Sequence, residues 1–525
     1  MRALTKNLRC REREPASIGT IIQRFRDGGE RDSSALLAGH LRSSPHVLRH
    51  RLLVTGEVQF GPISLSRGSI ADNLATMNSH RIPTARYIAR ALPISLTALA
   101  GLHLHAQAPA GVPTSQAPIR EQYELHDKAA AAARTAGDWA TVRRHASAVD
   151  TLFNGNPSTL MVIARASARL GDTAAALATV RSVVSMGVIR NLAGDPDLAP
   201  LRDLPEWKSL VSQNESNARP IGAPAKLFTM PEADFIAEDI VWDAARNRYL
   251  VSSVRKGTIV QVSADGTQTR FLQKAPDVWG IFALGLDTAR SRLWATTVAM
   301  SYVEGYAAAD SAKSAVLRYD LKTGALVKRY DLARTARGNS PGDVAVAPNG
   351  DLYVSDSRSG ILYTIRAATD SLEILVPAGT FMSPQGPAVS PDGKAVYVAD
   401  YVRGLAEVSI PSGKVRWLSH DRNVALSGID GLTFAGPGRL VAIQNGLLPH
   451  RLMVLGLDAV AGRITSAKVI AQDSASIHEP THGIVRGANF HFIANAGWDG
   501  FDDKGAILKD NPPVSPVIMS IKLDL

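Results

Sequence analysis

The chain has 525 residues, 45% of them hydrophobic and 20% charged, which is enough for several domains and at least one large core. The net charge of +10 does not indicate nucleic-acid binding, because residues 109–525 hold 43 basic and 41 acidic side chains, which nearly balance. The only cysteine is Cys10, so neither a disulfide framework nor a thiolate zinc site is expected in the rest of the chain.

The first 108 residues divide into two segments. Residues 77–108 have the order of a secretory signal peptide: three arginines, an apolar stretch, and the cleavage pattern Ala106-Gln107-Ala108. Because a signal peptide stands at the start of its protein, we interpret Met77 as the natural start and residues 1–76 as a non-native or disordered upstream extension. The mature protein is expected to be periplasmic or secreted, with no stable membrane span, since the apolar stretch is short.

A short helical region follows a linker at 109–118. Gly137-Asp138 recurs as Gly171-Asp172, 34 residues later, and each pair precedes an alanine-rich amphipathic run. This period is typical of tetratricopeptide helix pairs, so residues 119–215 are predicted to form a tetratricopeptide-like region. With at most two repeats it should dock on the rest of the chain or self-associate. We favour a structural cap over a peptide-binding groove, and a protein partner for this region stays open.

The remaining residues, 224–525, show short alternating strands separated by glycine, proline and aspartate turns, an all-β pattern. Two internal copies are clear: DVAVAPNGDLYVSD from Asp343 and GPAVSPDGKAVYVAD from Gly386. Aligning weaker copies with these gives six units spaced like four-stranded blades. The sequence therefore predicts a six-bladed β-propeller behind a small helical domain, with Lys226 to Met230 completing the last blade.

The first strand of each blade lines the axis of a propeller, so equivalent positions of the six units should converge there. Those positions are Glu238, Phe282, Gly342, Gln385, Asp430 and His482. Two carboxylates and an amide oxygen facing one channel are ligands for a hard divalent cation. We predict that the metal is held by Glu238, Gln385 and Asp430, with Ca²⁺ as the first expectation and Mg²⁺, Mn²⁺ or Zn²⁺ as alternatives.

At these residues the sequence resembles the senescence marker protein, gluconolactonase and luciferin-regenerating enzyme-like family. The resemblance is carried by Glu238 in AEDIVWD, by QGPAVSPDGKAVYVAD from Gln385, and by Asp430 in GIDGLTF. It implies a six-bladed propeller with an axial metal and an aspartate that acts as general base in lactone opening. The chain departs from the family in having Gln385 in place of an asparagine and Gly342 in place of another.

The resemblance implies an exported metal-dependent hydrolase that takes a lactone or a similar small ester as its small-molecule substrate. Asp430 would be the general base, with His482 assisting proton transfer. We expect Asp343, Tyr302 and Trp498 to contact the substrate. The alternative is a non-enzymatic propeller that binds a ligand or a protein, because this fold hosts many functions.

Two short motifs match catalytic patterns by letters alone. His478-Glu479-Pro480-Thr481-His482 fits the zinc-protease pattern, but Pro480 opposes the helix that this pattern requires. A local metal or substrate role for His478 and Glu479 stays open. Gly338-Asn339-Ser340-Pro341-Gly342 fits a nucleophile elbow but precedes a strand rather than a helix, so neither a protease nor a serine hydrolase is predicted.

Overall fold

The computed structural model describes residues 117–472 and 475–524. The segments predicted at 1–76 and 77–108, and nearly all of the linker at 109–118, lie outside the described residues. Within the described part of the chain, no helix combines the length and the apolar character needed to cross a membrane.

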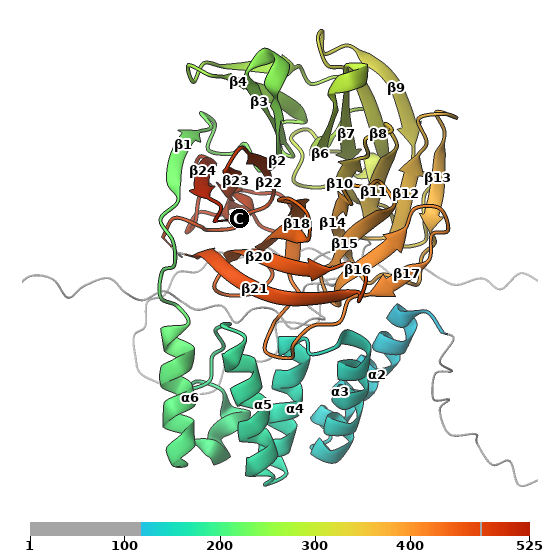
Figure 1. The fold of residues 1–525 in the computed structure, drawn as a ribbon. Coiled ribbons are helices and arrows are strands. Elements are labelled where there is room, and N and C mark those ends of the chain that lie inside the picture. The colour runs from blue at the N-terminus through green and yellow to red at the C-terminus, as the bar shows by residue number, and fades with distance from the viewer. Residues whose placement is uncertain (1–116, 473–474, 525) are drawn as a thin grey trace, which may run out of the picture. The chain divides into compact units, whose positions relative to one another are not determined.

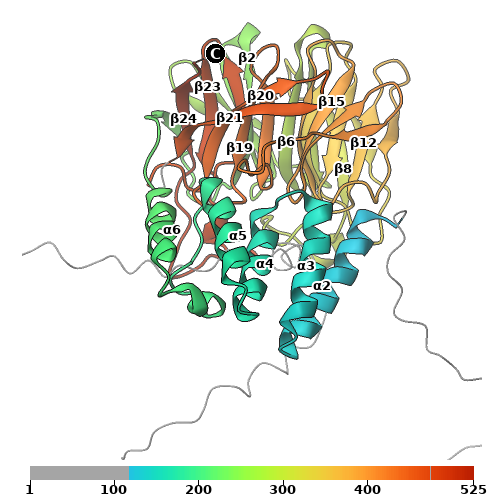
Figure 2. The same ribbon diagram turned by 60° about the horizontal axis from the view of Figure 1, so that its bottom comes forward.

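From residue 117 onward, the described part of the chain begins with five α-helices, and each contacts the next in chain order (Figure 2). They are α2 (Ile119–Thr135), α3 (Trp139–Phe153), α4 (Pro157–Arg169), α5 (Thr173–Ser185) and α6 (Pro205–Ser216), with the 3₁₀ helix η1 (Pro196–Leu201) between the last two. The repeated Gly-Asp pairs act as predicted at the helix junctions. Asp138 and Asp172 cap α3 and α5 by accepting from the amides of Thr141 and Ala175, while the glycines before them adopt positive φ.

Six four-stranded antiparallel sheets follow and surround a common axis, which confirms the predicted six-bladed propeller (Figure 1). Blades 1 to 3 consist of β2 (Ala237–Asp243), β3 (Arg248–Ser253), β4 (Thr258–Ser263) and β5 (Gln268–Leu272); β6 (Gly280–Asp287), β7 (Arg292–Val298), β8 (Ser314–Asp320) and β9 (Leu326–Asp331); and β10 (Pro341–Val346), β11 (Leu352–Asp356), β12 (Ile361–Ile365) and β13 (Leu372–Val376).

Blades 4 to 6 complete the ring. They consist of β14 (Pro384–Val389), β15 (Ala395–Asp400), β16 (Gly404–Ser409) and β17 (Val415–Trp417); β18 (Ile429–Phe434), β19 (Arg439–Gln444), β20 (Arg451–Asp458) and β21 (Arg463–Gln472); and β22 (Gly483–Arg486), β23 (Asn489–Asn495), β24 (Val517–Lys522) and β1 (Ala225–Thr229). The pairing of β1 with β24 confirms the predicted closure, in which the first strand of the propeller fills the outer edge of the last blade.

The helical region docks on the propeller, one of the two arrangements expected from its small number of repeats. Apolar side chains of α4, α5 and α6 share a buried cluster with Ala425 and Leu447 of blade 5 and its loops. Polar contacts cross the same boundary: the side-chain amide of Asn156 donates to the carbonyl of Val402, at 2.9 Å. The helices therefore cover apolar surface that blades 4 and 5 would otherwise expose.

Candidate functional site at the propeller axis

The first strands of the blades, β2, β6, β10, β14, β18 and β22, contact one another around the axis. In five of them the pairing with the second strand shifts register near the predicted axial residue. Such bulges re-aim side chains, which explains how one position per blade is turned toward the channel. Glu238, Gln385 and Asp430 each stand second in their strand, and His482 directly precedes β22.

Glycines after two axial residues let neighbouring inner strands approach closely. A Cβ on Gly386 would lie 2.5 Å from the carbonyl oxygen of Asp430, and a Cβ on Gly431 would lie 2.6 Å from that of Thr481. No side chain fits at such distances. The Gln-Gly and Asp-Gly pairs of the motif therefore have a packing cause, which is the narrowness of the ring.

Three of the axial side chains form a cluster. Asp343, Asp430 and His482 each place one carboxylate oxygen or ring nitrogen within 4.8 Å of the other two. His482 Nε2 lies 2.6 Å from Asp343 Oδ1, as an ion pair that lacks hydrogen-bond alignment. On its other side, His482 Nδ1 lies 3.1 Å from the backbone oxygen of Glu238, which links the cluster to blade 1.

The carboxylates of Glu238 and Asp430 keep partial exposure to the channel, and each is oriented by a donor from a loop. Trp498 Nε1 donates to Glu238 Oε2 at 2.8 Å. Asn445 Nδ2 donates to Asp430 Oδ2 at 2.6 Å, and Asn445 is itself held by the hydroxyl of Tyr401. One oxygen of each carboxylate is thus engaged by a loop residue.

Burial dominates the electrostatics of the cluster. It raises the pKa of Asp430 to about 7, with a further contribution from the negative charge of Asp343, while His482 opposes the shift. Burial and then the charge of Asp430 raise the pKa of Glu238 well above its ordinary value. Burial alone would lower the pKa of His482, but the carboxylates of Asp343, Asp239 and Asp430 raise it well above the ordinary value. The carboxyl groups outnumber the one nearby histidine, so the site must hold protons on some of them or bind a cation.

Asp239 belongs to this electrostatic neighbourhood although the sequence did not single it out. It is buried, and burial raises the pKa of its carboxyl to about 6. Its oxygens accept from the backbone amides of Leu284, at 2.7 Å, and Ile240, at 2.7 Å. Its role is therefore to join blades 1 and 2 beside the cluster.

The predicted metal ligand Gln385 stands second in β14, an inner strand of the ring. Its side-chain nitrogen donates to Ser383 Oγ at 3.1 Å. Its oxygen lies toward blade 3, where a Cβ on Gly342 would come within 3.8 Å of it. Asp343, predicted only as a substrate contact, is the residue that meets His482 instead.

The two predicted rim residues, Tyr302 and Trp498, do meet. Their rings pack edge to face with centroids 5.1 Å apart, and the Trp498 ring lies 6.1 Å from that of Phe282. Sequence reasoning missed Asn445, whose only signal is its place directly after the second strand of blade 5. It also missed the hydrogen bond from Trp498 to Glu238, because the loop insertions follow no repeat.

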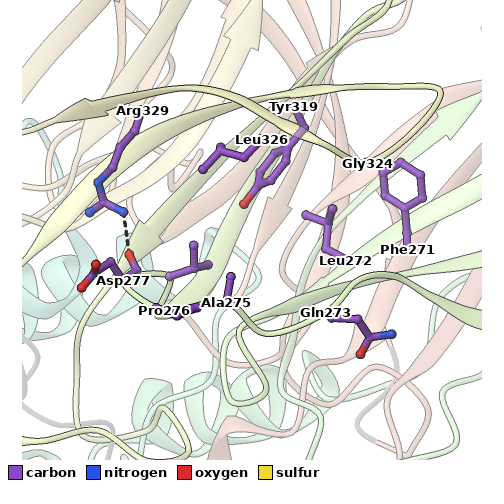
Figure 3. Close-up of a pocket in the computed structure, with 11 residues that line it drawn as sticks. Phe271, Leu272, Gln273, Ala275, Pro276, Asp277, Tyr319, Gly324, Leu326 and Arg329 are labelled. Atoms are coloured by element: carbon purple, nitrogen blue, oxygen red, sulfur yellow. Dashed lines mark hydrogen bonds between the residues drawn. The ribbon is translucent and has the colours of Figure 1, made fainter.

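Two cavities lie away from the axis. One, of about 390 Å³, is lined by the outer strands of blades 1 and 2, including Phe271, Tyr319 and Arg329 (Figure 3). The other, of about 500 Å³, is lined by α5 and the start of α6. Neither is lined by a residue of the axial cluster, so these two cavities and the concentration of ionisable groups are separate features of the molecule.

Comparisons with known proteins bear on the propeller. The SMP-30/Gluconolactonase/LRE-like region family model matches residues 236–415. Among solved structures, luciferin-regenerating enzyme aligns at 14% identity and a TM-score of 0.42, covering 58% of this chain and 96% of that chain. A gluconolactonase from Xanthomonas campestris aligns at 14% identity and a TM-score of 0.37, covering 57% of this chain and 98% of that chain. The calcium-binding protein regucalcin from Agrobacterium tumefaciens aligns at 16% identity and a TM-score of 0.40, covering 58% of this chain and 96% of that chain.

None of the curated proteins matches the chain. The family match extends from the end of the loop before β2 to the first residue of β17, so it includes Glu238, Asp343 and Gln385. The resemblance predicted from the motifs is thereby confirmed: residues 236–415 match the SMP-30/Gluconolactonase/LRE-like region model and lie within the six-bladed propeller.

Proposed function

We propose that this chain is an exported hydrolase that opens a lactone or a similar small ester with the help of a divalent metal ion at the propeller axis. The proposal rests first on the surplus of carboxylates there. Glu238, Asp343 and Asp430 face one histidine, and Asp343 Oδ2 is buried without a hydrogen-bond partner among the described residues. Buried charges of one sign need a cation or bound protons, because leaving them unpaired is costly.

The donor set fits a divalent cation. Asp343 and Asp430 would hold it, with the second oxygen of Glu238 nearby and His482 able to ligate once it has lost its proton. Carboxylate oxygens suit Ca²⁺ and Mg²⁺, and an imidazole nitrogen beside them extends the choice to Mn²⁺ and Zn²⁺. A cation bound there would polarise the carbonyl of the substrate as a Lewis acid.

The chain's own groups supply the remaining chemistry. Asp430 is placed to take the proton from an attacking water, since its Oδ2 is held by Asn445 and its other oxygen is left for the channel. His482 is fixed between Asp343 and the backbone of Glu238, and it completes the group of axial side chains on the blade-6 side. The rings of Tyr302 and Trp498 give the substrate an apolar wall beside Glu238.

The test is a thermal melt of the full chain after chelation, followed by addition of Ca²⁺, Mg²⁺, Mn²⁺ or Zn²⁺ in turn. A ligand that binds only the folded state adds about 2.7 kcal/mol of stability at a hundredfold excess over its dissociation constant. We expect one cation to raise the melting temperature of the wild type but not that of Asp430→Asn. Asp392→Asn, which changes an exposed carboxylate in the β14–β15 turn, is the matched control.

The cation that stabilises the protein would then be used with a panel of lactones. Hydrolysis by the wild type and its loss in Asp430→Asn would support the enzyme. Stabilisation by no cation, together with no hydrolysis, would overturn the proposal and favour a binding propeller.

A further inference from the structure

The segment from His478 to His482, which matched the zinc-protease letters, has another task in the fold. It is not helical: it runs along the rim before β22. His478 Nε2 donates to Asp499 Oδ2 at 2.6 Å, and the backbone amide of Asp499 donates to Glu479 Oε2 at 3.1 Å. The first two residues of the segment therefore bind the short 3₁₀ turn η5 (Trp498–Gly500).

Glu479 holds this turn with its backbone as well. Its carbonyl oxygen accepts from the amide of Ala496, at 3.2 Å. Its φ is 111°, a value that side-chain-bearing residues rarely adopt and that the surrounding contacts must enforce. Asn511 adds two further bonds, from its side-chain nitrogen to the carbonyl and the carboxylate of Asp499. The turn is thus fastened from both sides.

The other rim insertion also fixes this region. Arg255 donates to the carbonyls of Tyr302, at 3.1 Å, and Gly505, at 3.2 Å, which ties the two insertions together. Its guanidinium lies over the ring of Phe501, 4.7 Å from the centroid. The indole of Trp498 consequently has little freedom to turn.

The turn η5 directs one hydrogen-bond donor toward the axis, the indole N–H of Trp498. An indole has one N–H and no acceptor, and that of Trp498 is directed at Glu238 Oε2, at 2.8 Å. We infer that Trp498 is a positioning residue for Glu238, and that His478 and Glu479 hold the turn from which it acts. The contact between Trp498 and Glu238 does not depend on the function proposed above. Its consequence does: with one oxygen of Glu238 bound by Trp498, the other oxygen is directed to the proposed cation.

The contact itself is tested by nuclear magnetic resonance on the ¹⁵N-labelled full chain without metal. The indole signal of Trp498 is assigned by its loss in Trp498→Phe, which keeps an aromatic ring and removes the donor. We expect this signal to be protected from solvent exchange and to shift in Glu238→Gln, where the acceptor changes from a carboxyl to an amide oxygen. His478→Ala should speed its exchange, whereas His420→Ala, a change at a half-buried histidine in the loop after β17, should not.

Mn²⁺ titration then measures the consequence. Loss of one charge-assisted hydrogen bond corresponds to about a tenfold weaker affinity in Trp498→Phe, with no such change in the control Trp417→Phe on an outer strand. An indole signal indifferent to Glu238→Gln, or an unchanged Mn²⁺ affinity in Trp498→Phe, would overturn the inference. If the wild type binds no Mn²⁺ and none of the other three cations, the proposed function fails, while the indole signal still decides whether Trp498 positions Glu238.

Discussion

Arg451 on β20 is the side chain through which we expect the helical region and the propeller to be coupled most strongly. It is 3% exposed, and burial lowers the pKa of its guanidinium to about 10. Its Nη1 donates to the carbonyls of Met186, at 3.0 Å, and Gly187, at 3.1 Å, beyond the end of α5. Its Nε donates to Gln444 Oε1 at 2.6 Å. The guanidinium is therefore held by three acceptors, two of them in the helical region.

The change Arg451→Met keeps most of the aliphatic volume and removes all three bonds. Three buried acceptors left unpaired cost about 1 kcal/mol each at the low end, so we expect a loss of about 3 kcal/mol. Removal of the buried charge returns part of its desolvation cost, which makes larger losses unexpected. Urea unfolding followed by circular dichroism measures the loss, and the helical signal should disappear at lower urea than in the wild type.

Arg439→Met is the matched control, because Arg439 lies exposed on the neighbouring strand β19. We expect it to change stability by less than about 0.5 kcal/mol. If Arg451→Met unfolds at the same urea concentration as this control, the helical region is not held by Arg451, and the reasoning from the three bonds is wrong.

Three further changes test other parts of the structure. Gly386→Ala should destabilise the protein by about 1–3 kcal/mol in urea unfolding, because its Cβ would meet the Asp430 backbone at 2.5 Å. Tyr319→Phe should change stability by less than about 0.5 kcal/mol in the same assay, because the Tyr319 side chain lines the cavity of about 390 Å³ and its hydroxyl points into that cavity (Figure 3). Burial opposes the low pKa of Asp370, but bonds from Lys328 and Tyr330 and the charge of Arg318 bring it to about 2, so its contribution is present above about pH 4 and lost as pH falls toward 2. Asp370→Asn should remove about 1 kcal/mol at pH 7 after discounting for solvent screening at this 38%-exposed side chain, and almost nothing at pH 2.

The number of blades and the closure of the ring could be predicted because the blades repeat the same pattern of strands and turns. Each blade needs tight turns between its strands, and Pro-Asn-Gly and Pro-Asp-Gly mark those turns in the sequence. Once the copies were aligned, convergence on the axis followed from the symmetry of the fold. Glu238, Asp430 and His482 were predicted on this ground, and each lies at or beside an inner strand as expected.

Contacts between blades could not be predicted in the same way. The ion pair of Asp343 with His482 joins blade 3 to blade 6, and its length depends on the bulge in β10 beside Asp343 and on the loop that places His482 before β22. A repeat alignment gives the position of a residue in its own blade but not the direction of its side chain. This is why the alignment did not predict that Asp343, one residue beyond the aligned position, lies beside His482.

The balance of charges in the cluster explains why the residues that depart from the family pattern occur together. Gly342 stands where the resembling family has an asparagine, and the next residue, Asp343, brings a carboxylate into the cluster. An added negative charge in a buried site needs compensation, and His482 provides it at 2.6 Å. The cation at this axis would therefore compete with an imidazolium for the same carboxylates. The melting experiment should accordingly be performed above the pH at which His482 loses its proton as well as at neutral pH, and stabilisation by metal should increase with pH.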